Sequence, residues 1–362
     1  MGFLKKMSAT NRSNLITYAL VVMAFVVVQA LVSTDMISYS MQGLLVPICC
    51  YVVMAVSLNL VVGISGELSL GHAGFMSIGA FTGIVVMAQL ADAIPDPQVR
   101  LVVTIFVSGI MAAIAGFLIG IPVMRLHGDY LAIVTLAFGE IIKNVLNNLY
   151  VGIDPAGLHF SMTDAAGLHM QGGMILINGP QGAAGITMAS TFTLGFLLVL
   201  FCLFVVLNLK YSRSGRAIMA VRDNRIAAES TGINVTKYRL MAFVVAAALA
   251  GMAGALYAMN YSSIVPKKFD FNLSILVLVF VVLGGLGNIR GSIISAAALT
   301  ILPEALRAIA DYRMLLYAVV LIAVMLISNN PQLKGFFESV REKFRHHGDG
   351  DGAAAQGGEL DG

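Results

Sequence analysis

Long, unbroken runs of apolar residues recur along this chain, and they limit its fold more than any other feature. A helix that crosses a membrane needs about 20 apolar residues. Hydrophobic residues make up 58% of the 362 residues and charged residues only 11%. The runs are continuous and do not alternate with polar residues, which predicts helices and not barrel strands. The sequence therefore excludes a soluble globular protein and predicts an all-α, polytopic transmembrane helix bundle.

We expect about ten membrane spans, within a range of eight to ten, because two glycine-rich segments interrupt the apolar runs. The expected spans are 15–32, 44–62, a third ending near Leu90, 99–123, 131–147, 191–207, 242–259, 273–283, 293–306 and 314–327. Lys and Arg concentrate in the segments that this count places on one side, together with both termini, and cytoplasmic loops carry such an excess. We therefore predict a cytoplasmic segment at 1–14, a transmembrane domain at 15–328 and a cytoplasmic tail at 329–362 whose end is disordered.

One charged, helix-forming stretch at 208–239 lies between two of the apolar runs. It holds seven Lys or Arg residues and only two acids. Ser214 is expected to cap a first short helix, and Asp223 or Asn224 a second one that stops at Gly232. A positive anchor that fixes the topology explains part of the charge, but a simple connection needs no folded helices. We therefore interpret 208–239 as a docking element for a soluble partner.

A glycine-rich stretch, GISGELSLGHAGFMSIGAFTG at 63–83, follows the second apolar run. Glycine at this density weakens a regular helix. Either helices pack so closely here that only glycine fits, or an interrupted helix lines a passage. Glu67 and His72 favour the passage, because ionisable groups at membrane depth are usually functional or paired. A second interruption, GGLGNIRGS, occupies 284–292.

The segment 148–190 contains no Lys or Arg. A long loop without basic residues is expected outside the cell. It is interpreted either as an ordinary surface excursion or as a receiving surface for an extracytoplasmic partner.

The sequence holds no pattern typical of a catalytic, metal or nucleotide site. No G-x-x-x-x-G-K-[ST] motif is present, so we do not expect this chain to hold ATP. Cys49, Cys50 and Cys202 lie in apolar runs without the spacing of metal ligands. We expect no enzyme activity, no cofactor or metal in this chain, and no nucleic acid as a partner.

Four segments resemble the permease subunits of bacterial branched-chain amino acid ABC importers, most of all the LivM type. They are SLNLVVGISGELSLGHAGFMSIGA at 57–80, GDYLAIVTLAFGEIIKNVLNN at 128–148, GRAIMAVRDNRIAAESTGINVTKYRLMAF at 215–243 and VVLGGLGNIRGS at 281–292. The resemblance covers about 44–327. It implies a chain in the bacterial inner membrane, with a LivH-like permease, two cytoplasmic ATPase subunits and a periplasmic amino-acid-binding protein as partners. ATP would be used by the ATPase subunits.

The resemblance also marks candidate site residues. AAESTG at 227–232 stands where such permeases carry an EAA-like sequence, although its residue order departs from the strict form. The residues expected to couple to the ATPases are Gly215, Arg216, Arg222, Asp223, Ala227, Ala228, Glu229 and Gly232. A zwitterionic substrate needs hydrogen bonds along its path, and the candidates that line the translocation pathway are Glu67, Ser69, Gly71, His72 and Gly74.

Two alternatives stay open. A permease of a urea or short-chain amide ABC importer would share the fold and most of the motifs. A stand-alone secondary transporter would share the composition and the glycine breaks, but such proteins usually carry charged relays deep within their spans. It would also leave the capped basic helices unexplained.

Overall fold

The computed structural model describes residues 9–34, 38–126, 128–155, 157–170 and 172–306, with the single residues 319 and 322. The chain divides into two units, 1–301 and 302–362, and almost all described residues belong to the first. The described part is mostly helical. Its main helices are α1 (Ala9–Ser33), α2 (Tyr39–Asn59), α3 (His72–Gln89), α4 (Pro97–Val123), α5 (Asp129–Asn147), α6 (Phe192–Tyr211), α7 (Arg213–Asp223), α8 (Arg225–Ser230), α9 (Val235–Ala258), α10 (Phe271–Gly284) and α11 (Ile289–Ala305).

Six stretches of the described helices are long and apolar enough to cross a membrane. They are Asn14–Ser33, Met41–Ile64, His72–Gln89, Pro97–Val123, Phe192–Tyr211 and Val235–Ala258. Each matches an expected span. Helices α5, α10 and α11 occupy three further expected spans, but α10 and α11 have only 14 and 17 residues, and α5 carries Glu140 and Lys143. The tenth expected span, 314–327, lies outside the described residues except at 319 and 322. The described residues thus support a multi-pass bundle with six candidate spans, and the count of ten is not established.

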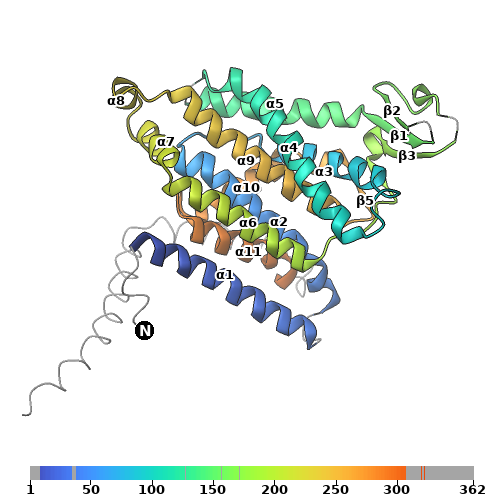
Figure 1. Ribbon diagram of the computed structural model, residues 1–362, viewed down its shortest axis with the longest axis horizontal. Helices are drawn as coiled ribbons and strands as arrows, with labels where there is room; N and C mark the ends of the chain where they lie inside the picture. The colour runs from blue at the N-terminus through green and yellow to red at the C-terminus, as the bar shows by residue number, and fades with distance from the viewer. Residues whose placement is uncertain are drawn as a thin grey trace, which may run out of the picture. The chain divides into compact units, whose positions relative to one another are not determined.

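Helix α9 is the centre of the bundle, packed against α2, α3 and α4 (Figure 1). Small residues allow the close approach. A Cβ atom added at Gly79 would lie 2.0 Å from the carbonyl oxygen of Gly251, and one added at Gly254 would lie 1.9 Å from that of Met76. Close glycine packing therefore explains part of the glycine content of 63–83, as one of the two sequence interpretations expected.

Replacing Gly254 by Ala should destabilise the bundle, because the new methyl group forces α9 away from the backbone of α3. The expected loss is about 1–3 kcal/mol, the usual cost of overpacking a core. Thermal unfolding of the detergent-solubilised protein measures it. Gly43→Ala is the matched control, because Gly43 is an exposed helical glycine with nothing within 4 Å of its added Cβ. Equal melting temperatures for the two variants would contradict the packing described here.

Both glycine-rich stretches interrupt helices. A π-helical turn, η2 (Leu60–Ile64), ends α2, and the chain then runs without regular structure until α3 begins at His72. Gly66 has φ +77°, a conformation that L side chains rarely adopt. The second break lies between α10 and α11, where Gly285 and Gly287 have φ +90° and +77°. We call residues 63–71 the first break and 284–288 the second break.

The segment 148–190 holds strands that the all-α prediction did not include. β1 (Tyr150–Asp154) lies between β2 (Gly157–Ser161) and β3 (Met174–Asn178) in an antiparallel sheet, and β4 (Ala183–Ala184) pairs with β5 (Ser263–Ile264). Figure 1 places these strands at one end of the helices and α7 and α8 at the other. The helical bundle therefore has two distinct ends, which we call the strand end and the α7–α8 end.

Candidate functional site

The charged stretch 208–239 folds into two short helices between α6 and α9. Ser212 has extended backbone, and its Oγ accepts a hydrogen bond from the backbone N–H of Gly215 at 3.0 Å. Ser212 is therefore the N-cap, and the prediction of Ser214 was wrong by two residues because α7 already begins at Arg213. A Cβ atom at Gly215 would lie 2.0 Å from the carbonyl oxygen of Leu209, so only glycine allows α7 to turn this tightly from α6.

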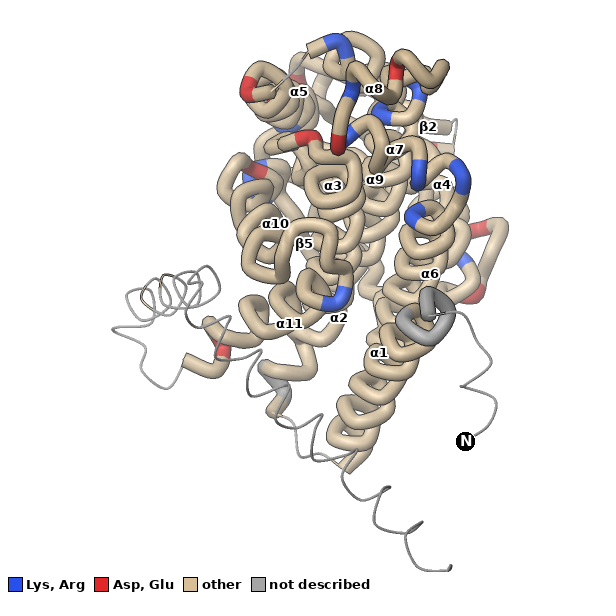
Figure 2. The backbone as a smooth tube through the Cα atoms, turned by 90° about the vertical axis from the view of Figure 1, so that its left-hand side faces the viewer, with Lys and Arg blue, Asp and Glu red and all other residues tan. Residues whose placement is uncertain are grey.

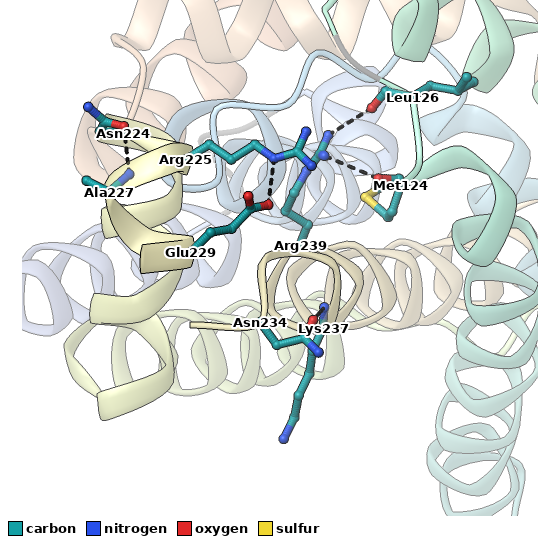
Figure 3. Close-up of polar contacts among 9 residues, drawn as sticks. All are labelled: Met124, Leu126, Asn224, Arg225, Ala227, Glu229, Asn234, Lys237 and Arg239. Atoms are coloured by element: carbon teal, nitrogen blue, oxygen red, sulfur yellow. Dashed lines mark hydrogen bonds and ion pairs between the residues drawn. The ribbon is translucent and has the colours of Figure 1, made fainter. Parts of the chain in front are cut away.

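The predicted limits of the second short helix are confirmed. Asn224 Oδ1 accepts from the N–H of Ala227 at 3.0 Å and caps α8, as Figure 3 shows. Gly232 has φ +83° and donates to the carbonyl of Glu229, while the N–H of Ile233 donates to that of Ala228. This paired pattern is the Schellman motif. Asn234 then caps α9 through the N–H of Lys237, so the chain changes direction twice between capped helices.

The three helices α7, α8 and the start of α9 share a small apolar core. Val221, Ala228 and Val235 are each less than 7% exposed, and Ile233 packs against them. On the surface, Arg225 and Glu229 form an i,i+4 ion pair along α8 at 3.0 Å (Figure 3). This core and these caps make residues 210–239 one folded piece. We call it the coupling element, after the role that the sequence predicts for it.

The outer face of the coupling element combines positive charge with one exposed apolar side chain. Lys and Arg gather around α7 and α8 in Figure 2. Ile226 in α8 is 80% exposed, more than any other large hydrophobic side chain among the described residues. Sequence reasoning did not single out Ile226. A lone isoleucine between the charged residues of a short predicted helix was the signal that was available in the sequence.

Arg222 connects the coupling element to the first break. Its Nη1 donates to the carbonyl oxygen of Gly63 at 3.0 Å, while its Nε and Nη2 hold the carboxylate of Asp223 at 2.9 and 2.8 Å. The Arg222 side chain also lies over Gly66, where an added Cβ would be 2.5 Å from Arg222 Cγ. The π-helical turn leaves the Gly63 carbonyl in an irregular backbone, and the guanidinium supplies a donor for it.

Lys210 connects the coupling element to the second break. Its Nζ donates to the carbonyl oxygen of Gly287 at 3.0 Å. The two breaks are joined to each other by Asn59, whose Oδ1 accepts from the N–H of Gly287 and whose Nδ2 donates to Ser292 Oγ, both at 2.8 Å. A Cβ atom at Gly63 would lie 2.2 Å from the Gly287 nitrogen, so the two backbones are in direct contact.

Arg239 makes the third connection and is buried, with 4% of its side chain exposed. Its Nη2 pairs with the carboxylate of Glu67 in the first break. Nη1 donates to the carbonyl of Met124 at 3.2 Å and Nη2 to that of Leu126 at 3.3 Å, both at the end of α4 (Figure 3). Arg239 therefore ties the start of α9 to the first break and to α4.

Three cations of the coupling element thus hold backbone or carboxylate oxygens of both breaks. Of the residues predicted from the sequence, this arrangement brings together Arg222, Asp223 and Glu67. It also contains Asn59, Lys210 and Arg239, which were not among the candidate site residues. The signal available in the sequence for Asn59 was an asparagine inside an apolar run.

The other pathway candidates lie against helices of this same chain. His72 is 2% exposed, and its Nε2 is hydrogen-bonded to Ser57 Oγ at 2.8 Å. Gly71 and Gly74 pack against α5, where Cβ atoms added to them would lie 2.1 Å from the Thr135 carbonyl and 3.1 Å from Gly139. Ser69 Oγ is buried and has no hydrogen-bond partner among the described residues. A role for these residues in the pathway stays a prediction.

Comparison with known proteins identifies the kind of chain that carries this site. The family described as "Branched-chain amino acid transport system / permease component" matches residues 40–327.

This chain belongs to that permease family.

Similar proteins include the high-affinity branched-chain amino acid transport system permease protein LivM of Escherichia coli K12. It is 36% identical over 305 residues, which cover 78% of this permease and 69% of that protein. LivH of Salmonella typhimurium is 26% identical over 281 residues, which cover 76% of this permease and 89% of LivH. The ribose import permease protein RbsC of E. coli K12 is 27% identical over 289 residues, which cover 77% of this permease and 82% of RbsC. No solved structure matches the permease.

The permease family and the fold agree on a multi-pass membrane protein. The family match includes both breaks and the whole coupling element. Across the part of this permease that the structure describes, no three His, Cys, Asp or Glu side chains cluster where they could hold a metal ion.

Proposed function

We propose that this permease is one of two membrane subunits of an ATP-driven importer that moves branched-chain amino acids into the bacterial cytoplasm. Membership of the branched-chain amino acid permease family and the 36% identity to LivM support this substrate class over urea or a short amide. The similarity to LivH supports a second, homologous permease as the partner. The observation that carries the proposal is the set of contacts between the coupling element and the two breaks.

The outer face of α8 is the proposed docking site for an ATPase subunit. Ile226 is the apolar anchor, and the surrounding Arg and Lys side chains suit an acidic rim around a groove. The termini and the α7–α8 end then face the cytoplasm, and the strand end faces the periplasm, where the segment 148–190 would meet an amino-acid-binding protein. ATP is held and hydrolysed by the ATPase subunits, and the permease itself is not an enzyme.

The coupling mechanism follows from the contacts. Closure of two ATPase subunits on ATP would move α7 and α8 as one piece, because Val221, Ala228 and Val235 bury a common core. Arg222, Lys210 and Arg239 would transmit that movement to the breaks, whose irregular backbone can change conformation more easily than a continuous helix. Such a shift biases the bundle between outward-open and inward-open states. Residues 67–74 of the first break and the start of α3 are the proposed contacts along the substrate path.

The proposed docking site is tested by Ile226→Asp. A charge at the centre of an apolar contact should reduce binding of the ATPase subunits by about tenfold or more, the effect of losing a hot-spot side chain. Co-purification with the ATPase subunits measures it. The matched control is Thr236→Asp, which places the same charge at an exposed position in the first turn of α9. Normal ATPase binding by the Ile226 variant would remove the proposed docking site.

The two alternatives are separated by uptake into membrane vesicles. Vesicles with the complete transporter should take up leucine, and excess urea should not compete. Vesicles that contain only this permease should not concentrate leucine. Uptake by the permease alone would instead favour a secondary transporter.

A further inference from the structure

A hollow at the strand end of the bundle contains a buried charge. Its volume is about 180 Å³, and it lies between the ends of α3, α4 and α9 and the strand-bearing segment. Most of its lining is apolar and includes Met87, Ile153, Met174, Leu176 and Met259. Of the described lining residues, only Arg100, in the first turns of α4, is charged.

Arg100 is buried and has no polar partner among the residues that the structure describes. It is 7% exposed, and its Nε atom is buried with no hydrogen bond. Within the described ranges, the Arg100 guanidinium makes neither a hydrogen bond nor an ion pair. Asp96, one turn earlier, is exposed, and its Oδ1 accepts from the backbone N–H of Gln98 at 2.9 Å and caps the helix.

Two physical effects oppose a free cation at this position. A buried charge without a counter-charge is costly, because desolvation is not offset by any attraction. The N-terminal end of a helix also carries partial positive charge, so a cation in the first turns of α4 is repelled. A bound anion would supply the missing counter-charge, and the N-terminal end of α4 would attract it. The guanidinium fork matches the geometry of a carboxylate, and low polarity strengthens the contact.

The shape and lining of the hollow restrict the anion. Its volume is several times the ~30 Å³ share of one water molecule and below the ~300–1,000 Å³ of pockets for drug-sized ligands, so the ligand is small. The apolar walls require an aliphatic body. Among the described residues, no Asp or Glu side chain lines the hollow, so the ammonium group of a zwitterionic amino acid would meet no counter-charge there. The ligand therefore carries a carboxylate and no ammonium.

We propose that this hollow binds a small aliphatic monocarboxylate, with the carboxylate on Arg100 and the aliphatic body against Met87, Leu176 and Met259. The site is separate from the breaks and the coupling element, which lie toward the α7–α8 end. The proposal goes beyond the transport function and does not depend on it.

The test is equilibrium dialysis of radiolabelled isovalerate against the purified full-length permease in phosphatidylcholine nanodiscs. Wild type should bind isovalerate saturably. Arg100→Met should weaken binding by about 10- to 100-fold, the value of a hydrogen-bonded charge contact. The affinity of Arg100→Lys for isovalerate should lie between those of wild type and Arg100→Met, because lysine keeps the charge and loses the two-pronged guanidinium geometry. Arg213→Ala, which removes an exposed arginine in α7, should bind as wild type does.

Competition and stability complete the test. Isopentylamine, which has the same aliphatic body and the opposite charge, should not compete, and leucine should compete weakly. Arg100→Met should melt at or above the wild-type temperature, because it removes an unpaired buried charge, so lost binding would not reflect unfolding. Equal binding by Arg100→Met and wild type, no saturable binding by wild type, or equal competition by isopentylamine would each overturn the proposal.

Discussion

Arg239→Met should remove a large part of the stability of the folded permease. The substitution leaves the Glu67 carboxylate and the carbonyls of Met124 and Leu126 without their donor. Breaking one side of a buried ion pair costs about 3–5 kcal/mol, a large part of the ~5–15 kcal/mol that typically separates folded from unfolded protein. Thermal unfolding in detergent and the amount of permease in the membrane both measure the loss.

Lys237→Met is the matched control for Arg239→Met. Lys237 lies two residues earlier in the same helix and is exposed, and Figure 3 shows its side chain pointing away from Arg239. Its loss should leave the melting temperature almost unchanged. Glu67→Gln should cost less than Arg239→Met, because the amide oxygen still accepts a hydrogen bond from Arg239. A wild-type melting temperature for Arg239→Met would show that this pair does not hold the first break.

The double substitution Arg222→Ala, Lys210→Ala should separate ATP hydrolysis from transport. It removes the donors to the Gly63 and Gly287 carbonyls and leaves Ile226 and the outer face of α8 in place. The ATPase subunits should still bind and hydrolyse ATP, while leucine uptake falls by about tenfold, the effect of losing about 1.4 kcal/mol of coupling free energy. Proteoliposomes with the complete transporter allow both rates to be measured on one sample.

Arg213→Ala is the control for this uncoupling. Arg213 lies in the same helix and is exposed, and its side chain makes no hydrogen bond or ion pair to any described residue. Its removal lowers the positive charge of the coupling element without touching either break. If Arg213→Ala reduces uptake as much as the double substitution, charge on the element matters and the two contacts do not.

Local features were predictable from the sequence, and long-range contacts were not. Asn224 and Gly232 were predicted correctly as helix limits because a cap depends on a few neighbouring residues. The first cap was placed at Ser214 and lies at Ser212, since two serines two residues apart both satisfy the same local preference. The second glycine break was also predicted, and the first was one of two interpretations of 63–83, because glycine at such density weakens any helix.

The contacts that join the breaks have no local signal. Asn59 and Gly287 are far apart in the sequence, and only the fold brings them together. The strands of 148–190 were missed because the segment was interpreted from its lack of basic residues, which indicates a side of the membrane and says nothing about secondary structure. His72 was predicted from its charge and position. The structure places it beside Ser57, inside the bundle, and its role in the pathway stays a prediction.

The central claim is that the coupling element and the two breaks move together when the ATPase subunits bind ATP. Pairs of spin labels in the complete transporter test it most directly, after Cys49, Cys50 and Cys202 have been replaced by Ala. One pair joins Arg213 in α7 to Leu286 in the second break, and another joins Leu286 to Met188 near the strand end, all of which are exposed positions. On ATP binding, the first distance should stay constant and the second should change. If the first distance changes while the second stays constant, the element moves without the breaks and the proposed coupling is contradicted.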